Sequence, residues 1–261
     1  MKRFFRAIGC LFLLALLGAG LLLVSHRKLY WDSHQELALS RHLSVLSLNT
    51  HRMGSFRKTP DNEVIRYLLQ TDVDILCLQE VEVYHDSHYL TFYELKNAFN
   101  KYPYSYFDFS VYNRRRQFGN VIFSRYPLVN KHSIPYESRS NISSACDVIV
   151  GPDTLRLITN HLESRRIEQQ DIDSVVQTRS LSSGELENKV LRSGLIRRQQ
   201  AKAVRQEVKS SPYPVIVVGD MNALPLSATY LTLRLGMRDC FLQTSNGSLG
   251  ATMSYYHIPL R

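Results

Sequence analysis

Short apolar runs separated by polar stretches recur along the chain, and several have the length of buried strands. Leu43–Leu48 alternates apolar and polar positions, whereas Ile75–Leu78 and Val215–Val218 are continuously apolar. A short continuous run bounded by turn residues is typical of a strand that is covered on both faces. Further strands are predicted in the middle of the sequence, at 102–109, 120–124, 145–150 and 154–159.

Two segments have the apolar spacing of helices. Val64, Ile65, Leu68 and Leu69 follow Asp61-Asn62, a natural N-cap, so a helix is predicted between the first two strands. A second helix is predicted over 195–208. Gly151-Pro152-Asp153 is a tight-turn signal between two strands, so part of the sheet should be antiparallel. The pattern predicts an α/β domain in layers, with helices outside paired sheets.

The first 28 residues differ from the rest. Ala7–Val24 is an uncharged stretch of 18 residues flanked by basic residues, and as a helix it would rise about 27 Å, close to the thickness of a bilayer core. We therefore expect an N-terminal transmembrane helix. Gly18-Ala19-Gly20 keeps a cleaved secretory signal open as the alternative.

This segment defines the expected domain organisation. Residues 1–28 are the predicted membrane anchor or signal, 29–42 a linker, and 43–261 a catalytic domain with a polar, exposed insertion at about 165–193. The expected location is the cell membrane, in single-pass form with the domain outside the cytoplasm, a side for which the flanking charges give only weak support. Secretion after signal cleavage is the alternative.

Charge and cysteine content exclude few classes of protein. Five of the 32 Lys and Arg residues lie in the first 28 positions, which leaves 27 basic against 23 acidic residues and a net charge of +4 for the remainder. Such a modest net charge is not decisive evidence for binding of DNA or RNA. Four cysteines form no disulfide framework or zinc spacing. Cys146 and Cys240 are the only plausible pair, and small buried side chains are the favoured reading.

Polar residues follow four of the predicted strands. Asn49 and Glu80 end the first two, His161 follows a strand at 155–159, and Asp220 and Asn222 follow the last. Each residue alone could be an ordinary strand exit or turn. Their recurrence suits hydrolysis of a phosphate ester, which requires charge neutralisation, an activated water and a proton for the leaving oxygen. Carboxylate and carboxamide oxygens suit Mg²⁺.

A set of motifs in this order resembles the endonuclease/exonuclease/phosphatase superfamily. The motifs are Leu48-Asn49-Thr50, Leu78-Gln79-Glu80, 119–127, Thr159-Asn160-His161-Leu162 and Gly219-Asp220-Met221-Asn222. The resemblance implies a four-layer α-β-β-α sandwich of two packed mixed sheets. It also implies divalent-metal hydrolysis of phosphate esters, with Mg²⁺ the usual ion and Mn²⁺ an alternative.

The resemblance also implies roles for individual residues. Glu80 resembles the family's metal-binding glutamate, and Asn49 the asparagine that helps to hold the metal. His161 matches the histidine that contacts the scissile phosphate or the leaving group. Asp220 and Asn222 match the pair that positions the attacking water and the phosphate.

Asn120 and Arg125 are looser matches, as substrate phosphate-binding residues. Arg125 at a strand end could steady a phosphate oxygen. Its Ser-Arg-x-Pro context is equally typical of a junction between a strand and a turn.

The sequence departs from the family pattern after Asn222. Family members continue with a strand and then a Ser-Asp-His segment whose Asp and His form the general-base pair, and no such pair follows here. We therefore expect the C-terminal strands of the domain to be missing and the sequence to be part of a longer reading frame, and such a fragment could be inactive. A catalytically silent, membrane-tethered binding module is the alternative function.

The substrate is expected to be a nucleic acid or a phospholipid head group, and a lipid phosphatase or sphingomyelin phosphodiesterase is a further alternative. The run from Tyr102 to Tyr112 is rich in aromatic residues and leads into Arg114-Arg115-Arg116. This combination could stack on bases or meet anionic head groups. The plainer reading is a strand with a buried aromatic face followed by a solvated loop.

Overall fold

The computed structural model describes residues 42–55, 62–138, 140–164, 184–244, 253–255 and 258–260. The predicted anchor at 1–28, nearly all of the predicted linker, and 165–183 of the predicted insertion lie outside these residues. In the part of the chain that is described, no helix has the length and apolar content needed to cross a bilayer.

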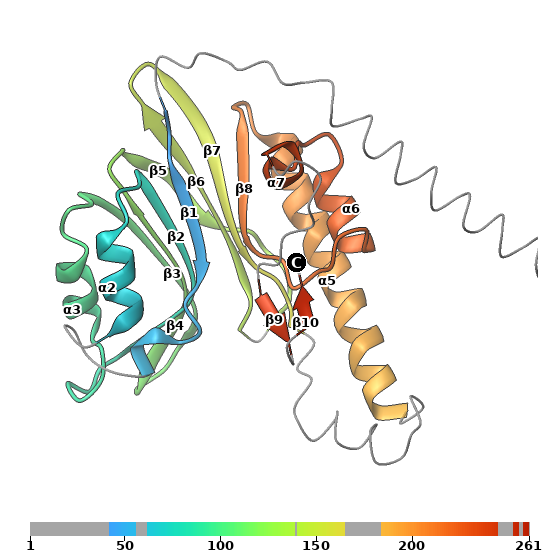
Figure 1. The fold of residues 1–261 in the computed structure, drawn as a ribbon, viewed down its shortest axis with the longest axis horizontal. Helices are drawn as coiled ribbons and strands as arrows, with labels where there is room; N and C mark the ends of the chain where they lie inside the picture. Colours follow the sequence, from blue (N-terminus) through green and yellow to red (C-terminus); the bar gives the residue numbers. More distant parts are fainter. Residues whose placement is uncertain are drawn as a thin grey trace, which may run out of the picture. The chain divides into compact units, whose positions relative to one another are not determined.

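Two mixed sheets of four strands each form the centre of the fold (Figure 1). The first has the order β1-β2-β4-β3 and contains β1 (Val45–Asn49), β2 (Ile75–Tyr84), β3 (Tyr104–Tyr112) and β4 (Arg116–Ser124). Within it β1 and β2 run parallel, whereas β2–β4 and β3–β4 are antiparallel.

The second sheet repeats this plan with one parallel pair. Its order is β5-β6-β7-β8, with strands β5 (Leu128–Ser133), β6 (Ile142–Val150), β7 (Asp153–His161) and β8 (Val215–Asp220). β7 and β8 are parallel, and the other pairs are antiparallel. Val150 pairs with Asp153 across the predicted tight turn, so the antiparallel hairpin is confirmed.

Helices cover the outer faces of both sheets. The first sheet has the short 3-10 helix η1 (Met53–Ser55), α2 (Glu63–Gln70) and α3 (Phe92–Ala98), and the second has α5 (Gly184–Ser210) and α6 (Ala228–Arg234). Asn62 caps α2 as predicted, because its side chain accepts a hydrogen bond from the backbone N of Ile65 at 3.1 Å.

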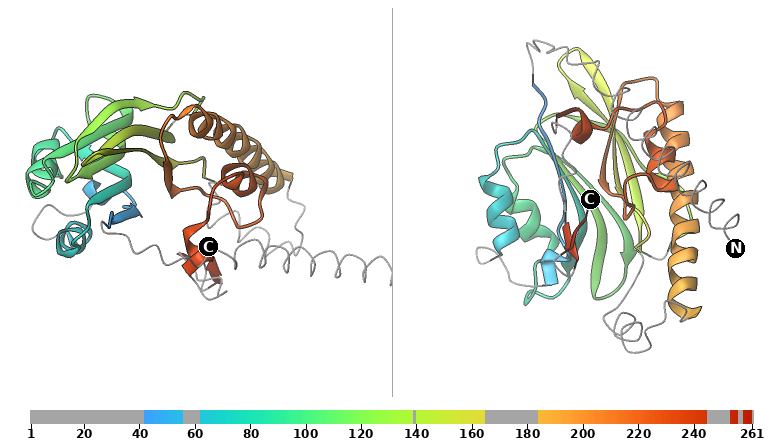
Figure 2. Two further views of the ribbon diagram at one scale, coloured as in Figure 1. Left: turned by 90° about the horizontal axis from the view of Figure 1, so that it is seen from above. Right: turned by 45° about the vertical axis from the view of Figure 1, so that its right-hand side comes forward.

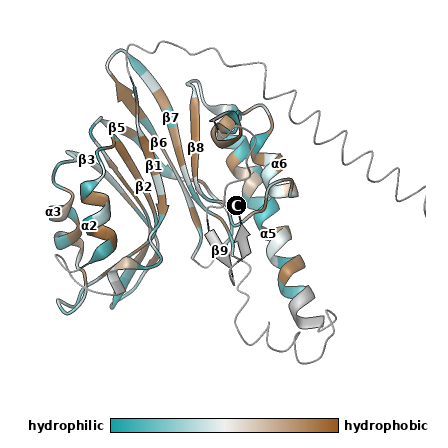
Figure 3. Ribbon diagram, viewed as in Figure 1, coloured by the Kyte–Doolittle hydropathy of each residue, from teal (hydrophilic) through white to brown (hydrophobic). Residues whose placement is uncertain are grey.

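Three apolar clusters separate the four layers. Leu76 and Leu78 of β2 face α2 and α3, whereas the alternate residues Ile75 and Cys77 face the second sheet. A third cluster joins the outer face of the second sheet to α5 and α6. Figures 1 and 2 show this order of layers, and Figure 3 shows hydrophobic residues concentrated on the strands. The predicted sandwich of helices outside two packed sheets is therefore confirmed.

Some predicted element boundaries were wrong. β2 does not end at Glu80 but continues to Tyr84, because a bulge at 79–80 shifts the register and lets the strand pair further with β4. α5 begins at Gly184 rather than at Leu195, so the last part of the predicted insertion is helical, and residues 188–192 are exposed there as expected. β5, α3 and α6 were not predicted, because each is short and lacks a long periodic pattern.

The chain divides into two compact units, one of which is Arg41–Leu235 and contains both sheets. The helices and strands described in the other unit are α7 (Cys240–Thr244) and an antiparallel pair, β9 (Met253–Tyr255) and β10 (Ile258–Leu260).

The described cysteines match the expectation of small buried side chains in two of three cases. Cys77 and Cys146 lie in the core between the sheets as free thiols, so the possible pair of Cys146 with Cys240 is not formed. Burial raises the pKa of the Cys146 thiol to about 12, which keeps it protonated and unreactive. Cys240 is exposed.

Candidate active site

The two parallel strand pairs bring four predicted site residues to one edge of the sandwich. Asn49 at the end of β1 pairs with Gln79 of β2, and His161 at the end of β7 pairs with Asp220 of β8. Because the carboxyl ends of parallel strands emerge on the same side, each pair delivers two adjacent polar residues there.

A single amide nitrogen connects the two sheets at this edge. Asn49 Nδ2 donates to Glu80 Oε1 at 2.9 Å and to Asp220 Oδ2 at 2.9 Å. His161 Nε2 lies 3.3 Å from the same Glu80 oxygen. Residues 31 and 171 positions from Asn49 thus share its side chain, and the structure brings Asn49, Glu80, His161 and Asp220 into one group.

Glu80 reaches this group because of the bulge in β2. Its φ is +53°, in the left-handed region that non-glycine residues rarely adopt. Backbone strain of this kind persists only where the surroundings impose it. Here Thr50 Oγ1 donates to the carbonyl oxygens of Gln79 and Glu80 at 2.9 and 3.1 Å, and the backbone N of Arg52 donates to Glu80 O at 3.1 Å. The segment after β1 therefore fixes the bulge that aims Glu80.

The turn after β8 holds Asp220 and Asn222 in a defined geometry. Asp220 Oδ1 accepts from the backbone N of Asn222 at 2.9 Å, an Asx-type contact. Asn222 has φ +46° and donates from Nδ2 to the carbonyl of Leu162 at 2.9 Å. This bond ties the β8 turn to the end of β7. One carboxylate oxygen of Asp220 therefore accepts a hydrogen bond from Asn49, and the other accepts one from the backbone of its own turn.

The Glu80 carboxyl is held in its charged form. Burial is the largest influence and opposes ionisation, but hydrogen bonds from His161 and Asn49, with the charges of His161 and His51, outweigh it. The pKa of Glu80 is therefore lowered, and a carboxylate is present at neutral pH. A partly buried carboxylate is a suitable ligand for a cation.

His161 is the most buried member of the group. The residue is 5% exposed, and its ring packs edge-on against Phe118 with centroids 6.4 Å apart. Nε2 faces Glu80, whereas Nδ1 has no hydrogen-bond partner in the part of the chain that the structure describes. A buried polar atom without a partner is unusual and suggests that the site is completed by another group.

The structure does not bring Asn120 and Arg125 into this group. Asn120 is fully buried between the sheets, and its Nδ2 donates to the carbonyl of Ile142 at 3.0 Å and the carbonyl of Thr159 at 3.3 Å. It acts as a tie between the sheets.

Arg125 lies at the opposite end of the first sheet. It follows Ser124, which pairs with Ile75 at the start of β2, five residues before Glu80. Its guanidinium forms ion pairs with Asp72 and Asp74. These contacts match the reading of Arg125 as part of a strand-to-turn junction.

Sequence reasoning missed a buried carboxylate beside the group. Glu82, two residues beyond Glu80, is fully buried and forms ion pairs with Arg52 and Arg116. Tyr84 Oη also donates to Glu82 Oε2 at 2.8 Å. The signal available in the sequence was the basic run 114–116, whose partner is visible only once β2 is known to continue through the bulge.

We expect Glu82 to make folding sensitive to acid. Burial opposes its ionisation, but hydrogen bonds from Arg52, Tyr84 and Arg116 outweigh this and lower the pKa of Glu82. A lowered folded-state pKa stabilises the fold above the unfolded value of about 4.3, and this contribution is lost as the pH falls through the folded value. The free energy of unfolding of wild type minus that of Glu82→Gln, from urea titrations, should therefore shrink below about pH 4. A difference that stays constant from pH 7 to pH 3 would contradict this.

Comparison with known proteins identifies the family. The fold is a two-sheet α/β sandwich with a carboxylate, amide and imidazole group at one edge. The model of the Endonuclease/Exonuclease/phosphatase family matches residues 46–258, and the chain therefore belongs to this family. The resemblance seen in the sequence is confirmed. Members of the family hydrolyse phosphate esters and generally use divalent metal ions.

Solved structures show the same fold at low sequence identity. Sphingomyelinase C from Streptomyces griseocarneus matches with a TM-score of 0.52 and 17% identity, over 75% of this chain and 70% of that one. An endonuclease/exonuclease/phosphatase from Beutenbergia cavernae DSM 12333 matches with a TM-score of 0.51 and 16% identity, over 74% of this chain and 52% of that one. Beta toxin from Staphylococcus aureus matches with a TM-score of 0.51 and 14% identity, over 75% of this chain and 71% of that one. None of the curated protein sequences matches the chain.

Proposed function

We propose that this protein is a divalent-metal-dependent hydrolase of phosphate esters, acting on phosphodiesters as a phosphodiesterase or nuclease. One observation carries the proposal: Asn49 Nδ2 joins Glu80 and Asp220 from the two sheets, and His161 contacts the same Glu80 oxygen. Three polar residues at strand ends and one on the β2 bulge thus come together, and Glu80 keeps 20% of its side chain exposed.

Glu80 is the proposed metal carboxylate. Its lowered pKa keeps it ionised, and Mg²⁺ usually takes one or two protein carboxylates and retains several waters. No cluster of three or more His, Cys, Asp or Glu side chains suited to a metal occurs among the described residues, so the proposed site relies on few protein ligands. When bound, Mg²⁺ or Mn²⁺ would neutralise charge on the phosphoryl oxygens.

Asn49 has a more specific part in this arrangement than the sequence suggested. Its Nδ2 faces the two carboxylates, and its Oδ1 accepts from the backbone N of His51 at 2.9 Å. Its carbonyl oxygen would reach a cation at Glu80 only if the carboxamide turned over. In the observed orientation, Asn49 sets the spacing of Glu80 and Asp220.

Asp220 and Asn222 are the proposed pair for water and phosphate. The Asp220 carboxylate is fixed through both oxygens, one on Asn49 and one on the turn. A carboxylate held in this way can orient a water molecule for attack. Asn222 is anchored through Nδ2 to the carbonyl of Leu162, and its carboxamide oxygen is the proposed contact to water or phosphate.

His161 is the proposed contact to the scissile phosphate or leaving oxygen, and its replacement tests the proposed function. His161→Gln keeps a polar side chain but cannot carry a proton, so Mg²⁺-dependent hydrolysis of bis(p-nitrophenyl) phosphate should fall roughly 10²- to 10⁴-fold. The measurement is initial rate against Mg²⁺ concentration, with the melting temperature as a check on folding.

His88→Gln is the matched control, because His88 is exposed and, among the described residues, its ring pairs with Asp86 two positions earlier. It should keep the wild-type rate. Equal rates in His161→Gln and wild type, or a wild-type rate that does not respond to Mg²⁺, would contradict the proposed function.

The membrane-anchored arrangement expected from residues 7–24 is part of the proposal. The supporting observation is the uncharged stretch of 18 residues with basic flanks. A domain tethered in this way outside the cytoplasm would meet lipids or extracellular nucleic acid. Fractionation of cells that express the full chain checks this, since alkaline carbonate removes peripheral proteins from membranes but leaves a spanning helix in place.

A further inference from the structure

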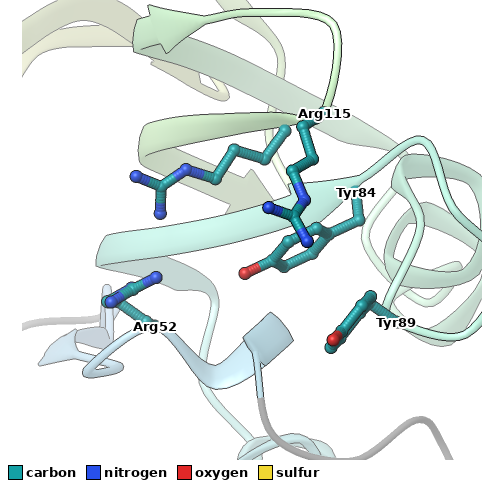
Figure 4. A pocket seen from close by; sticks show the side chains of 5 residues that line it. Arg52, Tyr84, Tyr89 and Arg115 are labelled. Carbon is teal, nitrogen blue, oxygen red and sulfur yellow. The ribbon is translucent and has the colours of Figure 1, made fainter.

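A pocket of about 340 Å³ lies near the end of β2 and the start of β4 (Figure 4). Three arginines and two tyrosines line it: Arg52, Tyr84, Tyr89, Arg115 and Arg116. They come from the segment after β1, from β2 and the turn that follows it, and from the start of β4. None of these residues belongs to the group around Glu80.

Guanidinium groups gather around one buried carboxylate in the pocket. Glu82 is the carboxylate at its base, and it pairs with both Arg52 and Arg116. The guanidinium of Arg115 has no ion-pair or hydrogen-bond partner within the described ranges of the chain, and the residue is exposed. Arg115 is therefore the pocket's available cation.

The aromatic wall adds a hydrogen-bond donor. Tyr84 and Tyr89 stack with ring centroids 4.5 Å apart, and Tyr84 Oη is engaged by Glu82. The Tyr89 hydroxyl has no hydrogen-bond partner among the residues that the structure describes, and Figure 4 shows Tyr89 facing the pocket below Arg115. The stacked rings hold this hydroxyl in place. A charged guanidinium and a hydroxyl are thus both available to a ligand.

The pocket is connected to the proposed active site through the backbone. Arg52 N donates to Glu80 O at 3.1 Å, so one residue supports the Glu80 bulge and lines the pocket. Glu82, the carboxylate at the base of the pocket, follows Glu80 by two residues in β2. The pocket is therefore built on the same stretch of β2 as Glu80.

We propose that this pocket binds a phosphate monoester group, carried by the substrate in addition to the ester hydrolysed at Glu80. A phosphate monoester has a charge of about −1.5 to −2 at pH 7, so clustered guanidinium groups attract it strongly. A diester phosphate of a nucleic-acid backbone carries only about −1 and is attracted less. Arginine also presents paired donors that fit phosphate oxygens. The assignment to substrate rests on the proposed function, whereas anion binding by the pocket does not.

The test uses direct binding without metal, by calorimetry in EDTA. Wild-type protein should bind glycerol phosphate, a monoester, more tightly than dimethyl phosphate, a diester. Arg115→Ala should weaken glycerol phosphate binding roughly 10-fold or more, because it removes a charged donor that has no structural partner. Tyr89→Phe, which keeps the ring stack, should weaken it by a few fold.

Arg114→Ala is the matched control, since Arg114 is exposed, adjacent and equally charged but does not line the pocket. It should change the dissociation constant by less than about 2-fold. Equal losses in Arg114→Ala and Arg115→Ala would show a general surface-charge effect and overturn the proposal. Equal affinity for the two phosphates would do the same.

Further arms identify the source of the monoester. Arg115-dependent binding to phosphatidylcholine vesicles that contain phosphatidic acid, beyond that to phosphatidylcholine alone, would indicate a lipid, and binding of glycerol phosphate alone a soluble ligand. Arg115-dependent binding of a single-stranded oligonucleotide without terminal phosphates, as tight as that of glycerol phosphate, would overturn the proposal. Glu80→Gln should not weaken glycerol phosphate binding, because it removes a negative charge near the pocket, so that failure of the active site and failure of the pocket remain distinguishable.

Discussion

Replacing Glu80 by glutamine is expected to lower the metal-dependent hydrolysis of bis(p-nitrophenyl) phosphate roughly 10³-fold or more, because metal ions contribute several kcal/mol to such reactions. The substitution keeps the shape of the side chain and removes its charge. Glutamine at this position can still meet Asn49 and His161 by hydrogen bonds, so the bulge held by Thr50 should persist.

The comparison that isolates the charge uses Glu63→Gln. Glu63 lies in the first turn of α2 and is largely exposed, and its ion pair among the described residues is with Arg66, three residues on. Its substitution removes the same charge from the protein but should leave the rate unchanged. Initial rates across a range of Mg²⁺ concentrations measure both variants. A Glu80→Gln rate within a few fold of wild type would exclude Glu80 as a metal ligand.

Replacing Gly219 by alanine is expected to be severely destabilising, by more than about 3 kcal/mol. Gly219 has φ +122°, a conformation that residues with a side chain rarely adopt. A Cβ there would lie 2.1 Å from the carbonyl oxygen of Asn160 and 2.5 Å from its backbone N. These are backbone atoms of the paired strand β7, which cannot move without breaking the β7–β8 ladder.

Gly194→Ala should raise the free energy of unfolding, whereas Gly219→Ala should lower it. Gly194 lies within α5, and a Cβ there would meet no atom within 4 Å, so alanine should stabilise the helix by about 0.5–1 kcal/mol. Urea unfolding of both variants measures the two effects under the same conditions. If Gly219→Ala retained wild-type stability, the close approach of β8 to Asn160 would be wrong.

The sequence predicted the layers of the fold because its strands are covered on both faces. Ile75–Leu78 and Val215–Val218 are continuous apolar runs, and each is sandwiched between a helix layer and the other sheet. Turn and cap signals were also local, as at Asn62 and Gly151. Short elements such as β5 and α3 have no comparable pattern and depend on contacts made in the folded chain.

The candidate site was predictable where side chains follow strand ends. Asn49, Asp220 and His161 were found in this way, and their strands indeed end there. Glu80 was found by the same reasoning, but its place on a bulge within a longer strand depends on tertiary hydrogen bonds from Thr50. Glu82 was missed for the same reason, since its burial follows from the extension of β2 and from ion pairs with distant arginines.

Asn120 and Arg125 show the limit of single-residue matching. Both fit the motif around β4, yet Asn120 is enclosed between the sheets. Arg125 follows the end of β4, beside Ile75 at the start of β2 and away from Glu80. Direction along an antiparallel strand decides which end of the sandwich a residue reaches. That direction follows from strand order, which local sequence does not specify.

Direct metal binding is the measurement that tests the proposed site most simply. Mn²⁺ replaces Mg²⁺ at oxygen ligands and is detected by electron paramagnetic resonance, which reports free ion without requiring a substrate. Wild-type protein and Glu63→Gln should bind one Mn²⁺ that Mg²⁺ displaces, and Glu80→Gln should lose this binding. Mn²⁺ binding of equal stoichiometry and affinity in Glu80→Gln and wild type would contradict a metal site at Glu80.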